Sequence, residues 1–142
     1  YVNKTKTEHI VPLSSQAVKL LTDLQAISSN SPYVFPSIRS PQRTMSENTI
    51  NLALRNLGYT SEQMCGHGFR AMARTILDEV LGYPIEVIEM QLAHAVKDAN
   101  GRAYNRTKYR EQRHKMMQHW SDYLDGLQAD NVVNLRIGGG VA

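Results

Sequence analysis

Apolar residues at helical spacing are the feature that most constrains this chain. They recur every three or four positions in five segments, and most of these segments end at a glycine or in a loop-like stretch rich in polar residues. Such spacing predicts amphipathic helices that pack their apolar faces together. The predicted helices cover about residues 15–28 (capped by Ser14 or Ser15), 46–57, 67–80, 84–94 and 103–124.

Strand-like patterns are few. Thr, Val and Ile alternate roughly over residues 1–13, which predicts a β-hairpin whose second strand ends at Pro12. Residues 36–44 read as a loop, and the weak tail at 126–142 holds one other strand-like piece, 132–137. We therefore expect a mainly α protein with a small antiparallel hairpin or sheet at its N-terminal end.

Composition narrows the function classes. The 142 residues suffice for one domain, and the single cysteine excludes an internal disulfide, which favours a reducing cytoplasm. No apolar run approaches the ~20 residues of a membrane-spanning helix. The net charge of +3 permits nucleic-acid binding. Basic side chains crowd residues 97–115, where they either neutralise phosphates or form a solvated helix face: Lys97, Arg102, Arg106, Lys108, Arg110, Arg113 and Lys115.

Several residues could carry chemistry. His67 and Arg70 lie three apart at a predicted helix start, where they could cradle a phosphate or form an ordinary surface pair. His94 closes another helix and could be a ligand or a capping histidine. Tyr104 and Tyr109 lie among the basic residues, as rim residues or as nucleophiles. The sequence has no spaced cysteine or histidine motif for a metal and no glycine-rich phosphate loop before a helix.

Four motifs follow one another in a specific order. They are Lys4 in the hairpin, His67-Gly68-Phe69-Arg70, Leu92-Ala93-His94 and Ala103-Tyr104-Asn105-Arg106. This order and spacing resemble the tyrosine recombinases, specifically the integrases of prophages and genomic islands. The resemblance implies a partial tyrosine recombinase catalytic domain that cuts DNA through a 3′-phosphotyrosyl link. It also implies that neither a cofactor nor a metal takes part.

The resemblance assigns roles to the matching residues. Tyr104 resembles the nucleophile, with Tyr109 as the second candidate, and Arg70 resembles the family's second conserved arginine, which holds the phosphate. His67 and His94 resemble the family's two histidines, one a proton acceptor or phosphate ligand and the other a donor to a nonbridging oxygen.

The hairpin lysine has a separate role. Lys4 resembles the residue that protonates the leaving 5′-oxygen, and Lys6, on the same strand face, is the second candidate. Lys6 is also expected to contact DNA, together with three residues beside the proposed nucleophile: Arg102, Arg106 and Lys108.

One catalytic position has no match. The family's first arginine lies in a helix before the hairpin, and Arg39, Arg43 and Arg55 do not fit its motif. Because the chain also begins at Tyr1 without an initiator Met, we expect a fragment that is inactive alone. Residues 1–125 would be the C-terminal part of the catalytic domain, and 126–142 a tail that is flexible or packs on a neighbouring protomer.

The implied partners are double-stranded DNA attachment sites and three further copies, giving a homo-tetramer of the full-length enzyme on DNA. The expected location is the bacterial cytoplasm, at the nucleoid, with no membrane association. Two alternatives remain open: a non-catalytic helical DNA-binding module or integrase relic, and a type IB topoisomerase domain.

Overall fold

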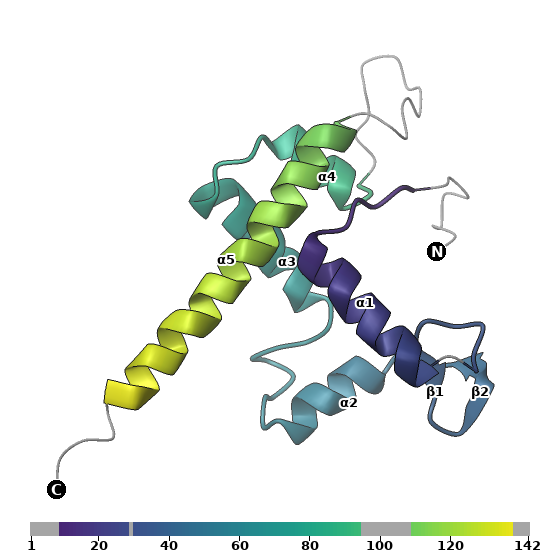
Figure 1. Cartoon of the computed structure of the whole chain (residues 1–142). Helices are drawn as coiled ribbons and strands as arrows, with labels where there is room; N and C mark the ends of the chain where they lie inside the picture. The colour runs from purple at the N-terminus through teal and green to yellow at the C-terminus, as the bar shows by residue number, and fades with distance from the viewer. Residues whose placement is uncertain (1–8, 29, 95–108, 138–142) are drawn as a thin grey trace, which may run out of the picture. The chain divides into compact units, whose positions relative to one another are not determined.

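The computed structural model describes residues 9–28, 30–94 and 109–137, and the backbone alone from 130 onward. Helices dominate, with one two-stranded antiparallel sheet, as the sequence predicts (Figure 1). Along the chain the elements are α1 (Ser15–Ser28), β1 (Pro36–Ser37), β2 (Ser40–Thr44), α2 (Thr49–Asn56), α3 (Gly68–Thr75), a π-helical turn η1 (Ile76–Val80), α4 (Ile85–Gln91) and α5 (Arg110–Ile137).

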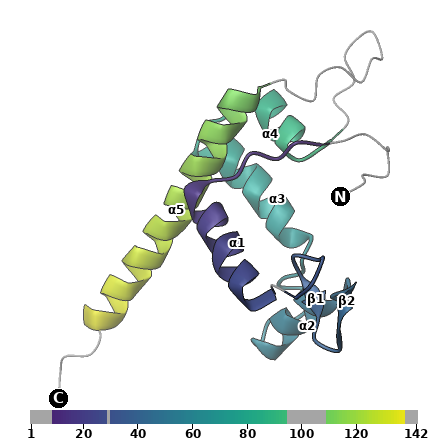
Figure 2. The same ribbon diagram turned by 45° about the vertical axis from the view of Figure 1, so that its right-hand side comes forward.

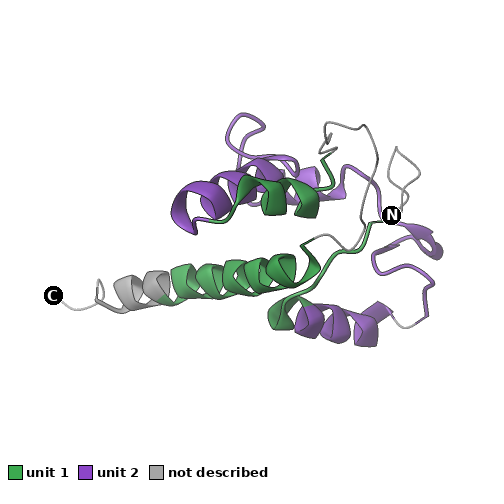
Figure 3. Ribbon diagram, turned by 90° about the horizontal axis from the view of Figure 1, so that it is seen from above, with its two compact units in different colours: residues 1–17, 83–142 green, residues 18–82 purple. Residues whose placement is uncertain are grey.

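The chain divides into two compact units, coloured separately in Figure 3. We call residues 1–17 and 83–142 the terminal unit, and residues 18–82 the middle unit. The division falls inside α1, so the first turn of that helix belongs to the terminal unit.

The terminal unit is built on the packing of α4 against α5. Val87 and Ile88 of α4 and Met116 of α5 are almost completely buried, so these apolar side chains form its core. Segment 9–14 passes beside the first turns of α5 (Figure 2), where Arg113 donates a hydrogen bond to the carbonyl oxygen of Ile10. Pro84 precedes the first turn of α4, where a missing N–H costs nothing.

A serine side chain starts α1. The Oγ of Ser14 accepts a hydrogen bond from the backbone N–H of Ala17 at 3.2 Å, which is N-cap geometry. The Oγ of Ser15 is exposed and instead donates to its neighbour Gln16. Of the two serines that the sequence offers as caps, Ser14 therefore serves.

The middle unit contains α1 from Val18 onward, the sheet, α2, α3 and η1, with Leu54 and Leu77 as buried apolar residues. The predicted helix stops are confirmed, because Gly58 and Gly82 adopt positive φ of 93° and 67°, conformations open to glycine. The predicted helix at 67–80 is present, but its last turn widens into η1.

The hairpin predicted at residues 1–13 can be compared with the structure only over residues 9–13, and there the prediction was wrong. Residues 1–8 of the expected hairpin lie outside the described residues, and 9–13 form no strand. The strands β1 and β2 instead occupy a stretch that reads as a loop, with Pro36 opposite Thr44 and Ser37 opposite Ser40. The Oγ of Ser37 accepts the N–H of Arg39 in the connecting turn. Proline and serine hide such a hairpin because they signal turns rather than strands.

The predicted strand at 132–137 is also wrong. Helix α5 continues through these residues to Ile137. Residues 103–108, the start of the helix predicted over 103–124, lie outside the described residues. Adding a residue to an existing long helix costs little, and this outweighs the strand preference of the valine pair at 132 and 133. Among the described helices, none is both long and apolar enough to cross a membrane.

Candidate active site

The start of α3 carries two of the predicted catalytic residues. His67 is the N-cap residue of α3 and is exposed, and Arg70, in the first turn, is half-buried. The backbone N–H of Arg70 donates to the carbonyl oxygen of His67 at 3.1 Å. The positive end of the helix dipole and a guanidinium therefore lie within one turn, a setting that favours a phosphate.

A glycine shapes the approach to this helix. A Cβ on Gly68 would stand 3.2 Å from Sδ of Met64, and the Gly68 N–H donates to the carbonyl oxygen of Cys65 at 2.9 Å. Residues 64–66 therefore fold tightly against the first turn of α3. A Cβ at position 68 would be tight against Met64, whose side chain would have to move by a few tenths of an ångström.

His94 lies just beyond α4, in a well-defined helix ending. Its backbone N–H donates to the carbonyl oxygen of Glu89 at 3.0 Å, and that of Ala93 donates to Met90 at 3.2 Å, the pattern of a Schellman motif. Ala93 occupies the left-handed position with φ of 54°, where glycine is usual. The backbone of His94 is thus fixed, while its side chain is exposed.

The ring of His94 has a carboxylate partner that the sequence analysis did not identify. Nδ1 of His94 is paired with Oε2 of Glu89. A carboxylate on Nδ1 holds the proton on that nitrogen and fixes the orientation of the ring, which directs Nε2 to a ligand. An acid five residues before a histidine at a helix end is the signal that could have revealed this pair.

The predicted site residues fall into three groups: those in the middle unit, those in the terminal unit and those outside the described ranges. His67 and Arg70 share one helix start in the middle unit, whereas His94 belongs to the terminal unit. Tyr109 is half-buried with φ of 59°, and its carbonyl oxygen accepts the N–H of Arg113 at the start of α5. The other predicted residues lie outside the described ranges: Lys4, Lys6, Arg102, Tyr104, Arg106 and Lys108.

The predicted basic stretch needs one correction. Arg113 is 1% exposed, and it donates from Nη2 to the carbonyl oxygen of Ile10 at 2.5 Å and from Nε to Oε1 of Gln91 at 2.8 Å. Burial lowers the pKa of its guanidinium. Arg113 therefore joins three segments of the terminal unit and does not face phosphates. Arg110 and Lys115 are exposed, and Lys115 pairs with Glu111 at 3.0 Å.

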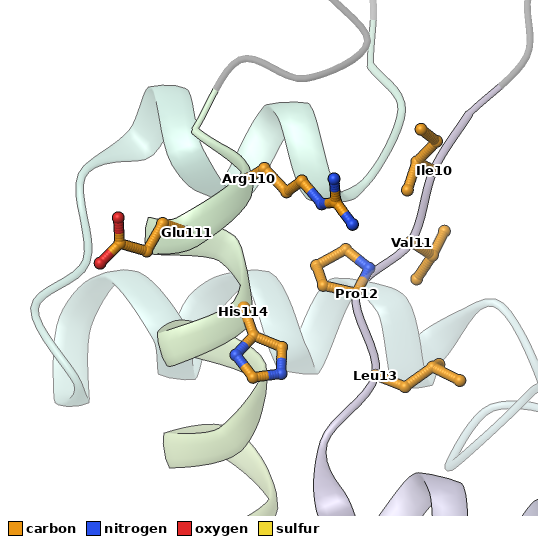
Figure 4. Close-up of a pocket in the computed structure, with 7 residues that line it drawn as sticks. All are labelled: Ile10, Val11, Pro12, Leu13, Arg110, Glu111 and His114. Atoms are coloured by element: carbon orange, nitrogen blue, oxygen red, sulfur yellow. The ribbon is translucent and has the colours of Figure 1, made fainter.

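An open groove of about 620 Å³ lies between segment 10–13 and the first two turns of α5 (Figure 4). Its walls are the side chains of that segment and three residues of α5. Figure 4 shows Arg110 extending from α5 toward Pro12, with Glu111 and His114 on the same helix. The groove is thus apolar on one wall and charged on the other.

The comparison with known families decides the identity of the chain. Residues 1–111 match the model of the phage integrase family, a span that includes every predicted catalytic position. The chain belongs to the phage integrase family. This confirms the family resemblance that the sequence motifs indicate.

Related integrases agree with this membership. The chain is 47% identical over 124 residues to the integrase of Enterobacteria phage P4. The aligned residues cover 86% of this chain and 28% of that protein. It is 38% identical over 130 residues to prophage integrase IntA of Escherichia coli K12, covering 92% of this chain and 31% of IntA. It is 42% identical over 130 residues to prophage integrase IntZ of the same strain, covering 92% and 32%.

The chain thus spans about three-tenths of the length of these relatives. No solved structure matches it. The activity and partners of the whole protein are accordingly proposals.

Proposed function

We propose that this chain supplies the C-terminal part of the catalytic domain of a site-specific DNA recombinase, with residues 1–125 as that part. The observation that carries the proposal is the family match over residues 1–111, because it contains the ordered set Lys4, His67, Arg70, His94 and Tyr104. DNA binding alone would not require a lysine, two histidines, an arginine and a tyrosine in this order.

In the proposed reaction, the hydroxyl oxygen of Tyr104 attacks a phosphorus of the DNA backbone. The new bond is a 3′-phosphotyrosyl link, and the bond to the 5′-oxygen breaks. A phenol ordinarily ionises near pH 10, at about three units above neutrality, so the tyrosine proton needs an acceptor, for which His67 is the candidate. The leaving 5′-oxygen takes a proton from Lys4, with Lys6 as the second candidate. Rejoining to another strand's 5′-hydroxyl reverses these steps.

The described residues support the phosphate-holding part of this scheme. Arg70 at the start of α3 offers a planar pair of donors to two phosphate oxygens, next to the positive end of the helix dipole. His94 is oriented by Glu89, which favours donation from Nε2 to a third oxygen when the ring is protonated. Each of these donors would stabilise the extra negative charge of the transition state.

The full-length enzyme is proposed to act on double-stranded attachment sites as a homo-tetramer in the bacterial cytoplasm. Arg102, Arg106 and Lys108 would contact the DNA backbone near Tyr104. Residues 126–142 would form a tail in contact with a neighbouring protomer or free of contacts. Because no position here fits the family's first arginine, residues 1–142 alone are proposed not to complete recombination.

Covalent trapping on a nicked suicide substrate tests the function. The full-length recombinase should form a protein–DNA adduct that survives denaturing gel electrophoresis, and Tyr104→Phe should abolish it. Arg70→Ala should slow its formation by about 10²–10³-fold, the cost of losing one preorganised donor. Efficient trapping by residues 1–142 alone would refute the incompleteness of the chain.

The same assay separates the alternatives. Binding that retards DNA without any adduct would identify a non-catalytic DNA-binding module. Relaxation of supercoiled DNA that lacks paired attachment sites would identify topoisomerase activity instead.

A further inference from the structure

Two polar side chains of α2 hold the loop that precedes α3. Oδ1 of Asn51 accepts the backbone N–H of Gly66 at 2.8 Å. One turn later, Nη2 of Arg55 donates to the carbonyl oxygen of Met64, and its Nε donates to the carbonyl oxygen of Asn51 at 3.3 Å. We call Asn51 and Arg55 the loop clamp, because they bind backbone groups on both sides of Cys65.

The clamped backbone runs directly into the proposed phosphate site. Gly66 is bonded to His67, and its Cβ position would stand 3.6 Å from Cγ2 of Ile50 and 3.7 Å from Oδ1 of Asn51. On the other side, Met64 stands 3.2 Å from the Cβ position of Gly68. Residues 64–66 therefore lie between α2 and the first turn of α3, and a shift of this loop would move His67.

Arg55 is placed at a cost in free energy. Its Nη1 is buried and has no hydrogen-bond partner among the described residues. A buried donor without a partner is unfavourable, because it loses its hydrogen bonds to water on burial. Buried polar groups without hydrogen-bond partners are uncommon in folded proteins, which favours a positional role for Arg55. The guanidinium of Arg55 binds backbone carbonyl oxygens, and its Nη1 is buried. We therefore do not assign Arg55 as a direct phosphate ligand.

We propose that Asn51 and Arg55 are positioning residues, which fix the start of α3 so that His67 and Arg70 meet the scissile phosphate together. This inference rests on the proposed function and deepens it. In this proposal the two clamp residues need not contact the DNA or the nucleophile. They act through the backbone of residues 64–66, where a misplacement of about 1 Å can cost ~10²-fold in rate.

The test compares two asparagines of α2 in the full-length recombinase. Asn51→Ala removes the clamp bond to Gly66, whereas Asn56→Ala changes an exposed asparagine of the same helix and serves as the matched control. Three quantities are measured for each variant: the single-turnover rate of adduct formation on the suicide substrate, the Kd for DNA, and the melting temperature.

Asn51→Ala should slow adduct formation by about 10- to 100-fold while the Kd changes less than about threefold. Asn56→Ala should leave the rate within about twofold of the parent. Asn51→Asp should restore most of the rate, because a carboxylate oxygen also accepts the Gly66 N–H. A merely structural role would lower the melting temperature and the active fraction, without changing the rate per active molecule.

If Asn51→Ala fails to fold, Arg55→Lys decides. An ammonium keeps the charge but cannot bond both carbonyl oxygens in the same fork, so the rate should fall with the Kd unchanged. A parental rate for Asn51→Ala, or for Arg55→Lys in its place, would overturn the inference, as would equal losses in the two asparagine variants. If the full-length recombinase formed no adduct, or if the adduct survived Tyr104→Phe, the proposed function itself would fail. A slow Arg70→Ala beside a parental Asn51→Ala would refute the clamp alone.

Discussion

The hydrogen bonds of Ser14 predict a measurable coupling, inside the terminal unit, between the first turn of α1 and α5. Ser14 is 1% exposed, and its Oγ accepts two hydrogen bonds: from the N–H of Ala17 at 3.2 Å and from Oγ of Ser121, on α5, at 2.6 Å. Ser14→Ala removes the N-cap, which costs about 1 kcal/mol, and leaves the Ser121 hydroxyl without its acceptor, which costs about 1 kcal/mol more. The free energy of unfolding should fall by about 2 kcal/mol.

A double-mutant cycle isolates the shared bond. Ser121→Ala should cost about 1 kcal/mol, and the double variant should cost about as much as Ser14→Ala, giving a coupling energy near 1 kcal/mol. Ser15→Ala is the matched control, because its exposed Oγ bonds only to a neighbouring side chain, and it should change stability by less than about 0.5 kcal/mol.

Urea unfolding measures these differences in the free energy of unfolding. The fluorescence of Trp120, the single tryptophan and the neighbour of Ser121, reports the transition. With an m-value of about 2 kcal/mol/M, Ser14→Ala should move the midpoint by roughly 1 M. Additive costs for the two single variants would refute the shared bond, and a larger loss for Ser15→Ala than for Ser14→Ala would refute the assignment of the cap.

Three further predictions concern the same unit. Ala93→Gly should raise the melting temperature, because relief of the left-handed conformation (about 1–2 kcal/mol) exceeds the entropic cost of glycine (about 0.5–1 kcal/mol); a lower melting temperature would contradict the helix ending described. Arg113→Ala should destabilise the chain by about 3 kcal/mol or more in urea, because it removes two charge-assisted hydrogen bonds; a parental midpoint would contradict its joining role. Hydrogen bonds from Gln16 and Gln118 lower the pKa of Asp122, so this carboxylate stabilises the fold above its ordinary titration range and the effect is lost as pH falls through the lowered value; Asp122→Asn should flatten the acid limb of stability against pH, and an unchanged limb would count against these bonds.

Local stereochemistry accounts for what the sequence predicted well. Gly58 and Gly82 end helices because they accept positive φ, and Pro84 precedes α4 because its missing N–H is no loss there. Such rules depend only on a residue and its near neighbours. The helices were therefore predictable along most of the described chain, with α2 shorter at its start than expected.

Long-range contacts account for what was missed. Arg113 reads as one more cation in a basic stretch, and only the fold reveals that it bonds to a carbonyl oxygen of residue 10 and to Gln91. The pair of Glu89 and His94 and the loop clamp likewise depend on how helix ends meet their neighbours. For the site, the residue types and their order are readable from sequence, whereas the groups that orient them are not.

The identity of the DNA-linked tyrosine tests the central claim most directly. Trypsin separates the two candidates, because Tyr104 lies in peptide 103–106 and Tyr109 in peptide 109–110. The full-length recombinase would be trapped on a suicide substrate and digested with nuclease and trypsin. Mass spectrometry would then identify the peptide that carries a nucleotide joined to tyrosine through a phosphate. The account predicts the modification on Tyr104, with none on Tyr109. A modified Tyr109, or a covalent adduct that survives Tyr104→Phe, would contradict it.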